Sequence, residues 1–133
     1  MRVYIESSVI SYMVARPSRD IIVLGHQQIT QEWWNQTLPQ LEACVSPIVI
    51  EEVSAGDRTL SKRRLDLVRS FEMLQLTDRA EHLVASYIRG GFLPEKAVRD
   101  ALHIAIAAVH GVEYLVTWNC RHIANAGYHQ EGF

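Results

Sequence analysis

The sequence has few cysteines, no long apolar run and no excess of either charge. Cys44 and Cys120 are its two cysteines. Two are too few for a disulfide scaffold and typical of a reducing cytoplasm, where we expect the protein to act. No apolar run approaches the roughly 18 residues that a membrane span needs, so we expect no transmembrane helix. The acid at Glu6 comes too early for a secretory signal peptide.

The charge balance restricts how the protein can bind a nucleic acid. There are 13 Lys and Arg residues against 15 Asp and Glu residues, so the formal net charge is −2. This argues against a protein that holds nucleic acid mainly by neutralising many phosphates. It leaves open an enzyme that contacts a few phosphates through metal ions. The 133 residues contain no repeat and no low-complexity tract, and we expect one domain over residues 1–133.

Short apolar segments alternate with helical patterns along the chain. We predict strands over residues 3–5, 43–45 and 114–117, with a brief strand within 71–76. Between them, N-cap residues, prolines and apolar spacing predict helices. These helices start near Ser8, Asp20, Ser46, Leu65, Asp78 (in a capping box with Glu81) and Pro94, the last ending near His110. Short apolar strands separated by helices indicate an α/β sandwich with a parallel sheet.

Polar residues gather where the predicted strands end. Residues 6–8 (Glu-Ser-Ser) follow the first strand, and residues 117–119 (Thr-Trp-Asn) follow the last. Ligands of open α/β sheets bind at the carboxyl ends of the strands. Two further acids, Glu52 and Asp100, have mostly apolar neighbours on helices, where a carboxylate is costly unless it is paired or bound to a metal. Oxygen ligands that converge in a pocket suit Mg²⁺ or Mn²⁺.

Three blocks of sequence resemble the PIN domain family, and most closely the VapC-like toxins of bacterial toxin–antitoxin pairs. The blocks are VYIESSVISY at 3–12, SPIVIEEVSAGD at 46–57, and RDALHIAIA at 99–107 followed by YLVTWNCRHIAN at 114–125. The resemblance implies a three-layer α/β/α sandwich with a short, mostly parallel central sheet. It also implies a metal-dependent endoribonuclease that uses Mg²⁺ or Mn²⁺ to hydrolyse RNA. A cognate antitoxin and a second copy of the chain, in a homodimer, are the implied protein partners.

The same resemblance assigns roles to single residues. Glu6, Glu52 and Asp100 match the family's metal-binding acids, with Glu51 the alternative to Glu52, and Asn119 stands where many members have a fourth acid. The hydroxyls that match supporting positions are those of Ser7, Ser8 and Thr117. Beside Asn119, Arg121 and His122 are placed to contact a substrate phosphate.

The chain departs from the family pattern in ways that favour a second hypothesis. Most members have Asp where Glu6 stands, and Asn119 removes one charge from the site, which weakens a second metal more than a first. The chain ends soon after residue 125, where relatives continue, so we expect the final edge strand to be missing. Residues 127–133 or another chain are then expected to cover the strand at 114–117. The second hypothesis is a catalytically weakened PIN-fold module that binds an antitoxin or another partner.

Several residues have both a structural and a functional interpretation. His103 and His110 lie seven residues apart on one helix, but we read them as core or surface histidines because the spacing offers no third ligand. Trp33 and Trp34 are read as one core and one half-exposed residue, with base stacking or an antitoxin contact as the alternative.

Overall fold

The computed structural model describes residues 1–90 and 97–119, and its centre is a parallel sheet. The strand order is β3-β2-β1-β4, and every pairing is parallel. Because the strands are parallel, their carboxyl ends lie along one edge of the sheet. The four strands are β1 (Arg2–Ile5), β2 (Glu42–Val45), β3 (Glu72–Met73) and β4 (Tyr114–Val116).

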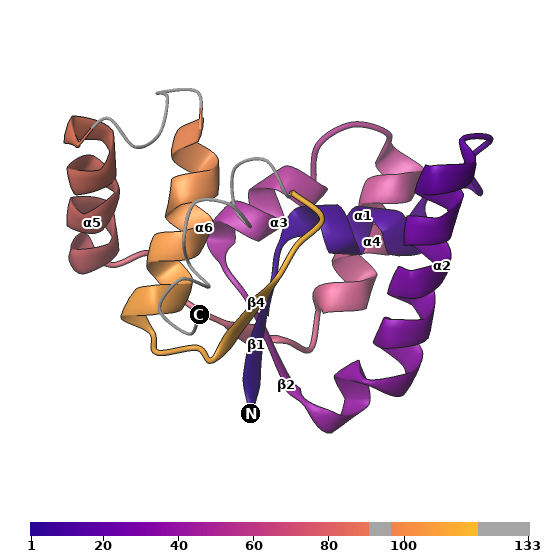
Figure 1. Cartoon of the computed structure of the whole chain (residues 1–133), viewed down its shortest axis with the longest axis horizontal. Helices are drawn as coiled ribbons and strands as arrows, with labels where there is room; N and C mark the ends of the chain where they lie inside the picture. The colour runs from indigo at the N-terminus through magenta and orange to yellow at the C-terminus, as the bar shows by residue number, and fades with distance from the viewer. Residues whose placement is uncertain (91–96, 120–133) are drawn as a thin grey trace.

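Helices cover this sheet on two sides. Figure 1 shows α5 and α6 on one side of the strands and α1, α2 and α4 on the other. The arrangement confirms the predicted α/β/α sandwich with a short parallel sheet. The helices are α1 (Ser7–Val14), α2 (Ile21–Gln36), α3 (Pro47–Val53), α4 (Arg58–Val68), α5 (Asp78–Arg89) and α6 (Val98–Val109), with a short 3₁₀ helix η1 (Leu38–Gln40). None of the described helices is long and apolar enough to cross a membrane.

Side-chain caps decide where most helices begin. Asp20 accepts hydrogen bonds from the first backbone N–H groups of α2, and Ser46 does the same for α3, as predicted. The predicted capping box at Asp78 is wrong by one residue, because Thr77 is the cap and its Oγ1 accepts from the Ala80 N–H at 3.2 Å. Asp57 caps α4, which therefore begins seven residues before the apolar positions that marked it. Pro94, the expected start of α6, lies outside the described residues.

The core forms around β1, which has a neighbouring strand on each side. Val3, Tyr4 and Ile5 have relative exposures of 2% or less, so this strand is buried on both faces. On α6 the small residues Ala101 and Ala105 are fully buried, and small residues of this kind let a helix approach its neighbours closely. The two tryptophans of α2 are both half-buried against the core, so the expected division into one core and one half-exposed residue is wrong.

The strand β4 forms one edge of the sheet among the described residues. It pairs with β1 on one side, and Tyr114 on it is 54% exposed. Residues 127–133, which we expected to cover this edge, lie outside the described residues.

Candidate metal centre

The carboxylate of Glu6 lies at the end of β1 and is held by four protein donors. It is the N-cap of α1, where its Oε2 accepts from the Ser8 N–H at 3.1 Å and from the Ser7 hydroxyl at 2.9 Å. Its Oε1 accepts from the Ser8 hydroxyl and from the Thr117 hydroxyl, the latter at 2.7 Å. Glu6 is only 5% exposed, so these bonds offset the loss of water around its charge.

A second carboxylate, that of Glu52 on α3, reaches the same place. Its Oε1 lies 2.8 Å from the Ser7 hydroxyl and 2.8 Å from the Nε2 of His103. Burial alone raises the pKa of Glu52, but the hydrogen bonds from His103 and Ser7 and the charge of Arg99 lower it. The net direction is a lowered pKa, so Glu52 is ionised at neutral pH.

The imidazole of His103 belongs to a buried row of polar side chains behind Glu52. His103 is fully buried on α6, and its Nδ1 lies 2.6 Å from the hydroxyl of Tyr4. That hydroxyl lies 2.8 Å from the Oγ of Ser46, the cap of α3. Burial raises the pKa of Tyr4, with a smaller opposing effect of the Ser46 hydrogen bond, so the phenol stays neutral.

Glu6, Glu52 and His103 together form a group whose ligand atoms lie within 4.8 Å of one another. An ionised carboxylate has about four lone-pair positions, and four protein donors contact Glu6. The Ser7 hydroxyl carries one proton and donates to one acid at a time. When it donates to Glu52, one lone pair of Glu6 Oε2 becomes open. The Oε2 of Glu52 accepts no hydrogen bond among the described residues, and its ion-pair partner, the Arg99 Nη1, lies 3.8 Å away. Two carboxylate oxygens from separate elements are a donor set that fits one hard divalent cation.

The structure brings together some of the predicted site residues at this edge. The hydroxyls of Ser7, Ser8 and Thr117 all donate to Glu6. Asp100 lies in the first turn of α6, one turn before His103, and is half-buried. It is not a member of the group defined by the 4.8 Å separation.

The remaining predicted residues are divided between the site and its surroundings. Glu51 is exposed and forms an ion pair with Arg99, so Glu52 is the acid of α3 that faces the site. Asn119 is half-buried after β4, and its backbone N–H donates to the Thr117 Oγ1 at 2.8 Å. Arg121 and His122 lie outside the described residues.

An apolar groove of about 210 Å³ lies beside this group. Thr117 lines the groove and also donates to Glu6, so the groove opens next to the acids. Trp33, Ile29 and Trp118 supply most of its large side chains. Trp118 is held in place, since its indole N–H donates to Thr30 at 2.7 Å and its ring stacks on His26 at 4.1 Å.

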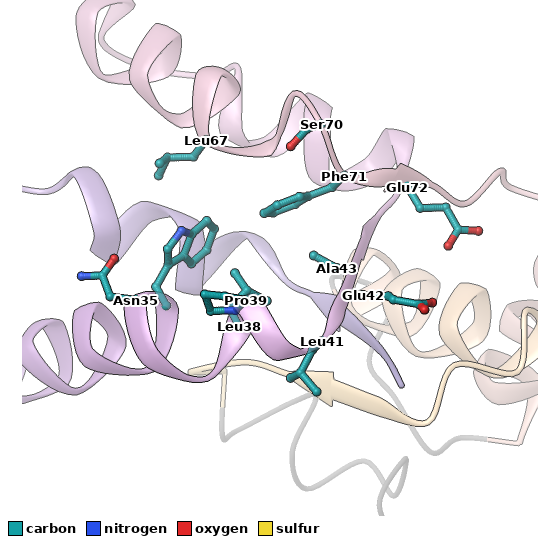
Figure 2. A pocket seen from close by; sticks show the side chains of 11 residues that line it. Asn35, Leu38, Pro39, Leu41, Glu42, Ala43, Leu67, Ser70, Phe71 and Glu72 are labelled. Carbon is teal, nitrogen blue, oxygen red and sulfur yellow. The ribbon is translucent and has the colours of Figure 1, made fainter.

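A larger groove of about 660 Å³ lies at the opposite edge of the sheet (Figure 2). Glu42 and Glu72 line it at the start of β2 and β3, whereas Glu6 follows the end of β1. Leu38 and Phe71 give it an apolar wall, and Glu72 is paired with Arg2 at 3.3 Å. The residues that fit a cation therefore belong to the carboxyl edge and not to this groove.

Comparison with known proteins identifies the fold. No protein-family model and no curated protein matches the sequence. A similar solved chain comes from the crystal structure of VapBC2 from Rickettsia felis bound to a DNA fragment from their promoter. The TM-score is 0.64 at 15% sequence identity, and the match covers 91% of this chain and 90% of that chain. The chain has a VapC-like PIN fold. The resemblance inferred from the sequence is confirmed at the level of this VapC-like fold.

Sequence reasoning missed three polar residues of the site within this VapC-like fold. Tyr4 was predicted as part of a short apolar strand and His103 as a core or surface histidine, and both are fully buried. The Tyr4 hydroxyl contacts His103 Nδ1, and His103 Nε2 contacts Glu52. Ser46 was predicted only as a helix cap. Two spacings in the sequence could have placed these residues at the site. Tyr4 lies two residues before Glu6 in extended backbone, and His103 lies one helical turn after Asp100, so each shares a face with a predicted site acid.

Proposed function

We propose that the chain is a metal-dependent endoribonuclease that hydrolyses RNA phosphodiesters. The observation that carries the proposal is the convergence of Glu6 and Glu52, which come from different elements and share the Ser7 hydroxyl. We assign Glu6, Glu52 and Asp100 as the residues that hold Mg²⁺ or Mn²⁺. The bound ion supplies a water of lowered pKa and neutralises charge on the phosphate oxygens.

The residues of the chain have separate tasks in this proposal. The hydroxyls of Ser8 and Thr117 hold Glu6 in one orientation, so that its remaining lone pair faces the cation. Asn119 stands near Thr117 and offers an amide oxygen in place of a fourth carboxylate. We assign Arg121 and His122 to the substrate phosphate, because a site made of acids needs a cationic contact on the other side of the phosphate.

The apolar groove beside the acids favours a single-stranded substrate. Trp33 and Trp118 line the groove together with Thr117, and bases stack on such side chains at about 1–3 kcal/mol each. Stacking requires a base that is not held within a duplex. We therefore propose single-stranded RNA as the substrate, with a base next to the cleaved phosphate lying in this groove.

The VapC-like fold also supports a biological setting. The similar solved chain comes from a VapBC2 complex bound to a DNA fragment from their promoter. We propose that this chain is likewise the toxin of a toxin–antitoxin pair, with a cognate antitoxin and a homodimeric state. A gene for a small DNA-binding protein directly upstream would support the assignment.

Cleavage of a labelled single-stranded RNA in Mg²⁺ and in Mn²⁺ tests the enzymatic proposal. We expect cleavage to favour Mn²⁺, which binds a given ligand set more tightly than Mg²⁺ does, and to stop in EDTA. Asp100→Asn and Glu52→Gln should lower the rate at least about a hundredfold, whereas Glu51→Gln, at the neighbouring exposed acid, should change it less than twofold. Cleavage that is unaffected by EDTA or by Asp100→Asn would contradict the proposal.

The second candidate is a PIN-fold binding module with a weakened site. Two observations favour it: Asn119 lacks the charge of a fourth acid, and four protein donors already contact Glu6. This candidate predicts no cleavage in either metal, together with tight binding of the upstream gene product. Cleavage abolished by Asp100→Asn would exclude it.

A further inference from the structure

A row of buried hydrogen bonds connects the cap of α3 to an acid of the candidate metal centre. It runs from Ser46 to Tyr4, from Tyr4 to His103, and from His103 to Glu52, with separations of 2.8, 2.6 and 2.8 Å. Ser46, Tyr4 and His103 are all fully buried. Because water is excluded from them, these groups must satisfy one another.

The proton inventory favours one direction along this row. Ser46 Oγ accepts from the Val49 N–H, so its own proton is available to Tyr4. Tyr4 then donates to the Nδ1 of His103, and the Nε2–H of His103 donates to Glu52, which is ionised and only accepts. Every donor has an acceptor in this arrangement. With Nδ1 protonated instead, the Ser46 proton has no acceptor among residues 1–90 and 97–119.

We propose that His103 is a positioning residue that orients Glu52 toward the cation, with its Nε2–H tautomer imposed by the hydroxyls of Tyr4 and Ser46. The inference rests on the proposed metal centre and adds to it a role for three residues. The bond to His103 occupies Oε1 of Glu52 and leaves Oε2, which has only the Arg99 guanidinium at 3.8 Å as an ion-pair partner, for the ion. In this arrangement His103 is not a ligand, because a nitrogen that carries a proton cannot bind a metal.

Nuclear magnetic resonance of the metal-free protein tests the tautomer without any ion. In protein labelled with ¹⁵N at histidine, we expect the Nε2 of His103 to carry the proton and Nδ1 to be the acceptor. A protonated Nδ1, alone or together with a protonated Nε2, would overturn the inference while leaving the proposed metal centre standing.

Metal binding tests the positioning role itself. Calorimetric titration with Mn²⁺ should show that His103→Leu, which removes the donor, weakens binding about 10–100-fold. His103→Gln, which keeps an N–H donor near the same place, should restore the Kd to within about threefold. Tyr4→Phe, which keeps the ring but removes the hydroxyl, should weaken binding by a smaller factor than His103→Leu. The control His110→Gln, at the C-terminal cap of α6 and bonded to the Gln75 carbonyl, should leave the Kd unchanged.

The outcomes separate this inference from the proposed function. Electron spin echo measurements on bound Mn²⁺ should show no directly coordinated nitrogen, and a coordinated imidazole would make His103 a ligand and overturn the inference. If the His103→Leu variant folds and binds Mn²⁺ with the same Kd as the wild type, the inference is also overturned. If His103→Leu does not fold, an unchanged Kd for Tyr4→Phe overturns the inference instead. If the wild type binds no Mn²⁺, the metal centre of the proposed function fails as well.

Discussion

Replacing Ser7 by alanine removes the single proton that two carboxylates share. The Ser7 hydroxyl lies 2.9 Å from Glu6 Oε2 and 2.8 Å from Glu52 Oε1. Without it the two negative groups face each other with no donor between them. An ion placed there would supply the missing positive charge, so the effect of Ser7→Ala should depend on whether metal is present.

The expected magnitude follows from the kind of bond that is lost. A hydrogen bond to a charged acceptor contributes about 1.5–3 kcal/mol, and we take about 2 kcal/mol because Ser7 is half-buried. For a domain of 133 residues this lowers the Tm by about 7 °C. In saturating Mn²⁺ the loss should shrink to less than half, because the ion then offsets the repulsion between the acids.

Thermal unfolding in EDTA and in millimolar Mn²⁺ measures both effects. The matched control is Ser11→Ala, which removes a hydroxyl one turn further along α1 and should lower the Tm equally in both buffers. If Ser7→Ala lowers the Tm by the same amount with and without Mn²⁺, the two acids do not share an ion. A loss no larger than that of Ser11→Ala in EDTA would show that the hydroxyl is not the bridge that we infer.

Three further predictions concern the acids and a buried thiol. Asn119→Asp should raise the RNA cleavage rate in Mg²⁺. If the wild type is already fully active in Mg²⁺ and the variant cleaves at the same rate, the amide of Asn119 does not weaken the site. Because the pKa of Glu52 is lowered in the folded state, its contribution to stability is present above about pH 4.3 and is lost as the pH falls below that value. Urea unfolding from pH 7 to pH 3 should therefore show a shallower pH dependence for Glu52→Gln, and parallel curves would refute this. Burial raises the pKa of the Cys44 thiol from its ordinary value of 9.0 to about 11. In a Cys120→Ser background this thiol should therefore react with a disulfide reagent at pH 8 about 100-fold more slowly in the folded than in the unfolded protein. Equal rates would contradict the burial.

Much of the fold could be predicted because its signals are local. The short apolar runs and the cap residues Asp20 and Ser46 act within a few positions, and the strands and helices that they predict are present. The error at Asp78 has the same origin, since Thr77 and Asp78 are both good caps and the sequence does not show which one adopts the extended backbone of a cap.

The candidate site could be predicted only in part, because its remaining contacts are not local. Glu6 follows a strand and Glu52 lies on an apolar helix, which made both conspicuous in the sequence. Tyr4 and His103 are 99 positions apart, and their contact depends on β1 lying next to β2 and β4 and on α6 packing beside them. Arg99 on α6 pairs with Glu51 on α3, 48 positions away in the sequence, and this contact depends on the packing of the two helices.

The position of β1 between β2 and β4 determines when the site can form during protein synthesis. Val3 pairs with Tyr114, and the Thr117 hydroxyl that holds Glu6 comes from the residue after β4. A ribosome must therefore complete about 117 residues, and release them from its exit tunnel, before Glu6 has all of its donors. A nascent chain that has reached α5 can pair β1 with β2 and β2 with β3, but it still lacks β4 and the Thr117 hydroxyl. This order delays completion of the site until residue 117 has left the ribosome.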